Sequence, residues 1–203
     1  MTPHHNSTTV ARACALLAFC FGSLFCLSVG AQTPDASLQP LTTVTGIDLP
    51  RYQGTWYQLA LYPNRFQAQC VANTRATYAL QEDGTVRVTN QCRKADGQES
   101  EAIGQARPAA SATVKQGELV PPQLKVRFAP QWLSWLPMVW GDYWVIQLAA
   151  DYRYVVVGEP KREFLWVLAR STSLTDADWT AINTRLKEQG YDPARLVREK
   201  HAP

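Results

Sequence analysis

The stretch LPRYQGTWYQLALYPNRFQAQC, residues 49–70, contains a Gly-Thr-Trp triplet, a run of strand-forming residues and a final cysteine. Aromatic residues and short turn signals around residues 55–62 are typical of a β-strand that ends at Pro63. Nothing in the stretch has the pattern of a catalytic motif. We interpret it as the first wall of a container built from strands.

Seven further short runs have strand character, and they are separated by turn residues. The dipeptides Asp83-Gly84 and Asp96-Gly97 suit the positive φ angles of tight hairpins. The predicted strands are residues 55–62, 72–80, 85–92, 99–107, 124–128, 143–148, 152–157 and 164–169. The chain is therefore predicted to form eight strands in simple succession.

After the last strand the period of the apolar residues changes. Trp179, Ile182 and Leu186 recur at helical spacing, Thr175 is a suitable N-cap, and Gly190 ends the pattern. The helix has an apolar stripe that needs a surface to pack on. We predict an all-β fold, an eight-stranded up-and-down antiparallel barrel with one C-terminal amphipathic α-helix packed outside.

Composition excludes several classes of function. The formal net charge of this 203-residue chain is only +3, which argues against nucleic acid as a partner. The histidines are His4, His5 and His201, and no glycine-rich phosphate loop is present. We therefore expect no cofactor, no metal and no catalytic residue.

The N-terminal segment is predicted to be a signal peptide. Residues 13–31 carry no charge, and Val29-Gly30-Ala31 supplies the small residues of a cleavage site. We divide the chain into a signal peptide at 1–31, a linker at 32–45, the folded domain at 46–199 and a tail at 200–203. An uncleaved membrane anchor is the alternative. Lipid attachment is disfavoured, because Cys20 and Cys26 each follow a phenylalanine rather than a small residue.

Removal of the signal peptide leaves two cysteines, Cys70 and Cys92. In an exported chain they most simply form one disulfide, and two buried free thiols are the alternative. Simple hairpin pairing about Asp83-Gly84 places Cys92 opposite Arg75. The disulfide therefore requires the chain before Arg75 to fold back by several residues.

Three motifs in order resemble the signatures of the lipocalin family. They are Gly54-Thr55-Trp56, Asp151-Tyr152, and Arg170 after the run FLWVLA. The run YPNRFQ at residues 62–67 and the closing helix resemble the bacterial outer-membrane branch, which is related to apolipoprotein D. The resemblance implies that Trp56 closes the barrel floor with Arg170 stacked across it, that Gly54 allows close passage, and that Asp151 and Tyr152 brace the same end.

The resemblance also implies a lipid ligand, either a fatty acid or a lysophospholipid, held in an apolar cavity. Alternation from Trp56 and from the later strands gives the expected lining. The candidate ligand-binding residues are Gln58, Ala60, Tyr62, Ala76, Tyr78, Trp140, Trp144 and Ile146. In an up-and-down barrel, Cys70 and Cys92 both lie near the open end, so we expect a disulfide at the mouth.

Residues 129–141, APQWLSWLPMVWG, form an unusually apolar connection between two predicted strands. Three interpretations are open, because loops normally lie on the surface. The connection is a lid over the ligand, a contact with a membrane surface, or a segment folded into the core. A membrane contact would use Trp132, Leu133, Trp135 and Leu136.

The sequence thus predicts an exported, non-enzymatic lipid carrier of the periplasm, with association with the outer membrane as an option. We expect a monomer or a weak dimer. Two other classes stay open, since a fold does not fix a function. One is a lipocalin-fold enzyme, which would need Cys70 or Cys92 as a free thiol. The other is a protein-interaction module that uses residues 129–141.

Overall fold

A computed structural model describes residues 39–110 and 118–201 of the chain. The predicted signal peptide and the first half of the predicted linker, residues 32–38, lie outside the described residues. None of the helices in the described ranges is long and apolar enough to cross a membrane.

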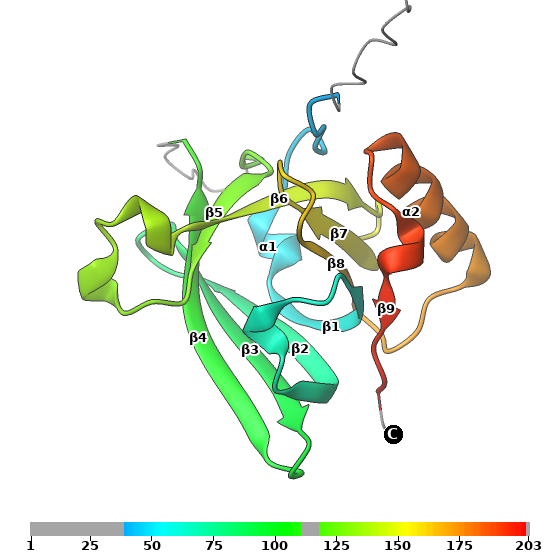
Figure 1. The fold of residues 1–203 in the computed structure, drawn as a ribbon. Coiled ribbons are helices and arrows are strands. Elements are labelled where there is room, and N and C mark those ends of the chain that lie inside the picture. Colours follow the sequence, from blue (N-terminus) through cyan, green and yellow to red (C-terminus); the bar gives the residue numbers. More distant parts are fainter. Residues whose placement is uncertain (1–38, 111–117, 202–203) are drawn as a thin grey trace, which may run out of the picture. The chain divides into compact units, whose positions relative to one another are not determined.

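The described residues form a closed antiparallel barrel, which confirms the predicted fold (Figure 1). Consecutive strands pair from β2 to β8, and β1 pairs with both β8 and β2. The strands are β1 (Gly54–Leu61), β2 (Cys70–Leu80), β3 (Val86–Lys94), β4 (Glu99–Pro108), β5 (Gln123–Arg127), β6 (Gly141–Leu148), β7 (Tyr154–Gly158), β8 (Leu165–Ala169) and β9 (Val197–Arg198). The closure removes the free sheet edges that would otherwise invite pairing with other chains.

Two ends of the barrel are distinguished by their connections. The connections after β2 and β6, the end of β4 and the start of β5 lie at one end together with the short helix α1 (Leu49–Tyr52), and we call this the closed end. The connections after β1, β3, β5 and β7 lie at the other end, which we call the open end. Short 3-10 helices occur at η1 (Arg65–Gln67), η2 (Gln131–Leu133), η3 (Pro137–Val139) and η4 (Pro193–Arg195).

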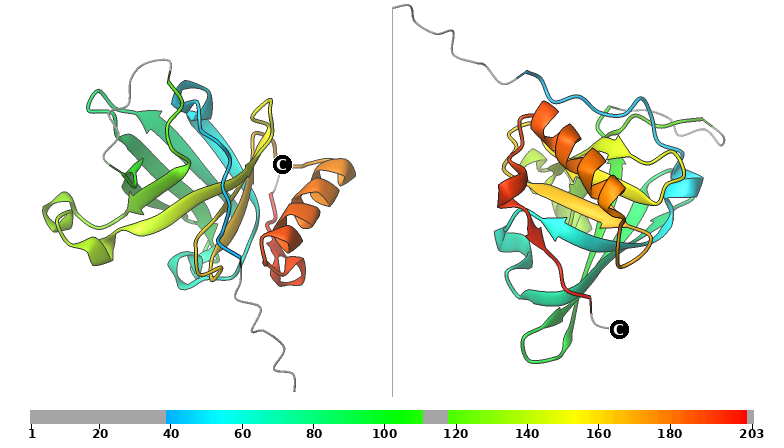
Figure 2. Two further views of the ribbon diagram at one scale, coloured as in Figure 1. Left: turned by 90° about the horizontal axis from the view of Figure 1, so that it is seen from above. Right: turned by 90° about the vertical axis from the view of Figure 1, so that its right-hand side faces the viewer.

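The predicted helix is α2 (Asp176–Glu188), and it packs outside the barrel (Figure 2). It begins with a capping box, in which the Thr175 hydroxyl accepts the Asp178 N–H and the Asp178 carboxylate accepts the Thr175 N–H. Ile182 and Leu186 are fully buried against the barrel wall. The change of period in the sequence therefore marks a real change of element.

Two separate apolar clusters divide the barrel wall between its two faces. The inner cluster includes Trp56, Val88 and Val155, whereas the outer cluster lies under α2 and includes Val156 and Val167. Both faces of β7 are covered, so its run of three valines is buried throughout. One face of the wall thus builds the interior of the container, and the other supports the helix.

Two segments differ from the sequence prediction. The end of the predicted linker is part of the folded domain, because Leu41 is buried in the outer cluster and the Val44 N–H donates to the Val145 carbonyl at 3.0 Å. The strand β9 was not predicted. It pairs with the open-end half of β1, where Ala60 lies opposite Arg198. A two-residue strand has too few residues to give a periodic signal.

Candidate functional site

The closed end is built around Trp56, which has no exposed surface. The Arg170 guanidinium lies 3.8 Å from the centre of the Trp56 ring, and it donates to the Thr55 carbonyl at 2.9 Å and the Arg51 carbonyl at 2.7 Å. Gly54 has a φ of +90°, and a Cβ added there would lie 3.4 Å from an Arg170 nitrogen. This is the arrangement that the family resemblance implies for these three positions.

Tyr152 and Asp151 brace the same end. The Tyr152 hydroxyl accepts the Asp48 N–H at 3.0 Å, and the Arg51 guanidinium lies 4.0 Å from the centre of the Tyr152 ring. Asp151 binds Arg153 at 2.9 Å, and hydrogen bonds from Arg153 lower the pKa of the Asp151 carboxyl. The Tyr152 contacts hold α1 across the closed end, whereas Asp151 pairs with Arg153 within the β6–β7 turn.

Three tyrosine side chains meet inside the barrel above this floor. The Tyr143 hydroxyl lies 2.7 Å from the Tyr52 hydroxyl and 3.0 Å from the Tyr78 hydroxyl. Burial raises the pKa of Tyr78 to about 12 and the pKa values of Tyr52 and Tyr143 well above the usual range. We call these three residues the tyrosine trio. Of its members the sequence prediction named only Tyr78, although Tyr143 alternates with the inward-facing Val145 and so carried a signal.

The structure places part of the expected lining on the inner face. Ala76 and Tyr78 belong to the inner cluster, and Gln58 is buried on the same face of β1 as Trp56. Three of the eight candidate ligand-binding residues therefore face the interior of the barrel.

Ala60 and Tyr62 lie on the opposite face, in the outer cluster with Ile182 of α2. The alternation fails because β1 has a bulge between Gln58 and Ala60, where its register with β8 shifts by one residue. Tyr62 consequently points away from the lumen, and its hydroxyl donates to the Asp192 carbonyl at 2.7 Å. The expectation that these two residues line the cavity is corrected.

Trp144 and Ile146 share a face, as expected, but it is the outer one. Their neighbours Tyr143 and Val145 pack in the inner cluster. Trp140 is also outside, because its ring lies 4.3 Å from the Arg107 guanidinium, and Arg107 alternates with the inward-facing Ala106. These three residues do not line the lumen. The alternation in the sequence predicts which residues share a face of the strand, but it does not tell whether that face is the inner or the outer one.

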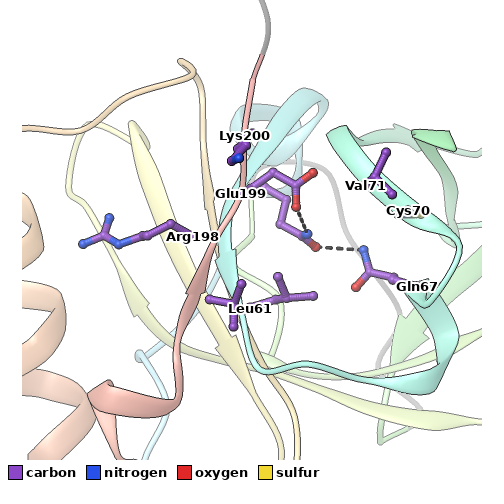
Figure 3. Close-up of a pocket in the computed structure, with 9 residues that line it drawn as sticks. Leu61, Gln67, Cys70, Val71, Arg198, Glu199 and Lys200 are labelled. Carbon is purple, nitrogen blue, oxygen red and sulfur yellow. Dashed lines mark hydrogen bonds between the residues drawn. The ribbon is translucent and has the colours of Figure 1, made fainter. Parts of the chain in front are cut away.

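The open end carries a polar network around a cavity of about 250 Å³ (Figure 3). The Gln67 side chain donates to the Gln58 side-chain oxygen Oε1 at 2.9 Å, and the Gln58 side-chain nitrogen donates to the Glu199 carboxylate at 2.9 Å. The Trp166 indole N–H donates to Gln67 at 2.9 Å, while Glu199 also accepts the Thr74 hydroxyl at 2.8 Å. The network joins β8, the β1–β2 connection, β1, β2 and the segment after β9.

The side chains of Arg198, in β9, and of Glu199, the next residue, point in different directions. Glu199 points into the cavity in Figure 3, whereas Arg198 points away from it, toward α2. The Arg198 guanidinium lies 3.1 Å from the centre of the Trp179 ring. Sequence reasoning gave no role to Gln67 or Glu199, and nothing in the chain order brings residue 199 next to residue 58.

The predicted disulfide between Cys70 and Cys92 is confirmed, with the two Cα atoms 5.5 Å apart. Arg75 lies opposite Gln91, and β2 makes two register shifts between residues 75 and 70. Asn73 has a φ of +58° within this irregular stretch. The chain therefore folds back in the way that the simple hairpin register required. Because both thiols are consumed, neither can act as the nucleophile of the alternative enzyme.

The apolar connection between β5 and β6 leaves the barrel sideways, on the side away from α2 (left view of Figure 2). Trp132 is 73% exposed, Trp135 75% and Met138 86%. Trp140 anchors the connection, because its indole N–H donates to the Ser134 carbonyl at 2.8 Å. The interpretation of this segment as ordinary core is therefore wrong for the exposed residues.

Comparisons with known proteins agree with the fold. A family model described as a lipocalin-like domain matches residues 47–201. Temperature-induced lipocalin-1 of Arabidopsis thaliana is 36% identical over 157 residues, which are 77% of this chain and 80% of that protein. The outer membrane lipoprotein Blc of Escherichia coli K12 is 28% identical over 190 residues, which are 92% of this chain and 96% of that protein.

Solved structures show the same architecture at lower sequence identity. Insecticyanin from the tobacco hornworm Manduca sexta superposes with a TM-score of 0.58 at 18% identity, covering 80% of this chain and 85% of that one. Lobster apocrustacyanin A1 has a TM-score of 0.58 at 18% identity, covering 76% of this chain and 79% of that one. The closed barrel, the Trp56–Arg170 floor and the family match together show that the chain belongs to the lipocalin family.

Proposed function

We propose that this protein is an exported lipid-binding lipocalin of the bacterial envelope, which holds a fatty acid or a lysophospholipid in its barrel. The observation that carries the proposal is the contrast along the inner face. Trp56 and Val155 at the floor are fully buried, whereas the inward-facing Val126, Tyr143 and Trp166 keep part of their surface exposed. An acyl chain would gain about 0.8 kcal/mol per CH₂ group removed from water.

Several observations support an envelope location. The Cys70–Cys92 disulfide fits an oxidising compartment such as the periplasm. The Escherichia coli relative is named an outer membrane lipoprotein. Residues 1–31 have the pattern expected of a secretory signal. We place the protein in the periplasm, in contact with the outer membrane.

The contact with the membrane would use Trp132, Trp135 and Met138. Residues 129–141 contain no charged side chain, and tryptophan favours the interface between water and lipid. A carrier that touches the bilayer beside its open end could take up and release lipid there. Leu133 and Leu136, which the sequence prediction included, are less exposed and support the connection from within.

Native mass spectrometry tests the proposal directly. The protein is purified from its envelope fraction and measured before and after delipidation. An added mass that matches one fatty acid or lysophospholipid, lost on delipidation and regained on titration, is the expected result. A protein that arrives empty and also refuses these lipids would contradict the proposal, and a bound protein partner would then favour the interaction module.

A further inference from the structure

The tyrosine trio spans the interior of the barrel. Tyr52 comes from α1 at the closed end, Tyr78 from β2 and Tyr143 from β6. Three strands separate β2 from β6 around the barrel, so the 3.0 Å contact between Tyr78 and Tyr143 joins opposite walls. The tyrosine trio therefore forms a polar bridge across the barrel, between the packed floor and the space toward the open end. We refer to this bridge as the crossbar.

The hydrogen bonds within the crossbar leave one hydroxyl hydrogen without an acceptor. Three hydroxyl groups carry three hydrogens, but the trio makes only two hydrogen bonds, from Tyr52 to Tyr143 and from Tyr143 to Tyr78 in either direction. Among the described residues, these hydroxyls have no other hydrogen-bond partner. Whichever way the bonds run, one O–H is without an acceptor.

That spare donor is in a place where water is scarce. Tyr52 is 3% exposed and Tyr78 is 6% exposed. An unpaired buried O–H destabilises the folded state, so native proteins almost always give it an acceptor. Tyr143 faces inward but keeps part of its surface exposed, so it is the member of the trio that an acceptor inside the barrel would approach.

The chemistry around the crossbar favours an acidic acceptor. The three hydroxyls are protonated at neutral pH, as tyrosine hydroxyls ordinarily are, and burial raises their pKa values further. The guanidinium of Arg170 stacks on Trp56 on the floor side. At the mouth, by contrast, Glu199 already points a carboxylate into the cavity, and Lys200 lies beside it. A negatively charged head would meet a carboxylate as well as an ammonium group there, whereas the trio offers it a donor with no carboxylate among its hydrogen-bond partners.

We infer that the spare hydroxyl of the trio binds the carboxyl oxygen of a fatty acid that enters the barrel head first. The inference rests on the proposed lipid-binding function and narrows it to free fatty acids. A phosphate-linked headgroup is bulkier than a carboxyl group, so a lysophospholipid would keep its head outside the crossbar.

Removing single hydroxyls does not test this inference, because any one or two substitutions leave at least one spare O–H. The triple variant Tyr52→Phe/Tyr78→Phe/Tyr143→Phe removes every donor and keeps the shape of the rings. Loss of all partners of a buried network at constant shape is nearly neutral for stability. The matched control is Tyr57→Phe/Tyr154→Phe, whose rings pack outside, against His201 and in the outer cluster.

The ligands are palmitate, labelled with ¹³C at the carboxyl carbon, and palmitoyl-lysophosphatidylcholine, each added to the delipidated full chain. We expect the triple variant to bind palmitate about tenfold more weakly than wild type, since one charge-assisted hydrogen bond is lost. The control variant should bind as wild type does, and the lysolipid should bind both variants equally. The ¹³C signal of palmitate in the wild-type barrel should not titrate where free palmitate does.

Two results would overturn the inference, and they are distinguishable. Palmitate that binds wild type and the triple variant equally, with a carboxyl signal that titrates as in solution, would place the head at the mouth and leave the lipid-binding function intact. A wild-type protein that binds neither palmitate nor the lysolipid would remove the proposed function together with this inference.

Discussion

The two ends of the barrel use aromatic residues in opposite ways. At the closed end Trp56 is fully buried beneath the Arg170 guanidinium, whereas at the open end Trp132 and Trp135 are about three-quarters exposed. The same residue type is therefore structural at one end and available to a partner at the other. The comparison shows that abundance of tryptophan in the sequence carries no functional meaning until each ring has been placed.

The largest loss of stability is expected from a substitution at the closed end. Trp56→Ala removes a fully buried indole and leaves Arg170 without its stacking partner. We expect a loss of about 3–5 kcal/mol in the free energy of unfolding, from the cavity and the lost transfer energy. Chemical denaturation monitored by circular dichroism measures it. A loss below 1 kcal/mol would show that the floor does not stabilise the fold.

The second-largest loss of stability is expected from removal of the disulfide at the open end. The double variant Cys70→Ser/Cys92→Ser frees a loop whose ends are 22 residues apart in sequence. Loop-closure entropy predicts a loss of about 3 kcal/mol. The same denaturation experiment, repeated on wild type with reductant, gives an independent value. If both give no loss, the irregular start of β2 is held by its other contacts, such as the Asn73 N–H bond to the Lys200 carbonyl.

A smaller, pH-dependent contribution to stability is expected from an ion pair at the closed end. Arg153 donates to Asp178 at 3.1 Å, and this hydrogen bond lowers the pKa of the Asp178 carboxyl. The stabilisation is present above the carboxyl's unfolded pKa, near 4, and is lost as the pH falls through the lower folded pKa. The difference in unfolding free energy between wild type and Asp178→Asn should therefore shrink between pH 6 and pH 3. A difference that grows on acidification would contradict this sign.

The smallest effect on stability is expected from the exposed tryptophans. Trp132→Ser/Trp135→Ser should change the free energy of unfolding by no more than about 0.5 kcal/mol, as surface substitutions usually do. The same variant should lose most of its flotation with phospholipid vesicles. The control is Leu119→Ser, which removes an exposed apolar side chain (62% exposed) before β5, at the closed end. Equal flotation of both variants would refute the membrane contact.

The fold could be predicted from the sequence because its signals are local. Turn dipeptides such as Asp83-Gly84, short strand-like runs and the helical spacing of Ile182 and Leu186 each act over a few residues. The three family signatures then fixed the topology. The disulfide followed from the number of cysteines outside the predicted signal peptide.

The lining of the barrel could be predicted only in part, because side-chain direction depends on every residue being in register. One bulge after Gln58 reverses the faces of Ala60 and Tyr62. A second shift of register, between Val145 and Gln147, affects β6. The crossbar and the Gln67–Gln58–Glu199 network join residues from separate elements. No local pattern in the sequence predicts contacts between residues that lie so far apart in the chain.

The central claim is that a lipid occupies the open half of the barrel, above the tyrosine trio. The most direct test is a crystal structure of the delipidated protein soaked with 16-bromohexadecanoic acid, with the bromine located by anomalous scattering. We expect one bromine site inside the barrel, between Tyr143 and Gln67. A fatty acid that binds only on the outer surface at Trp132 and Trp135, with no site inside, would contradict it.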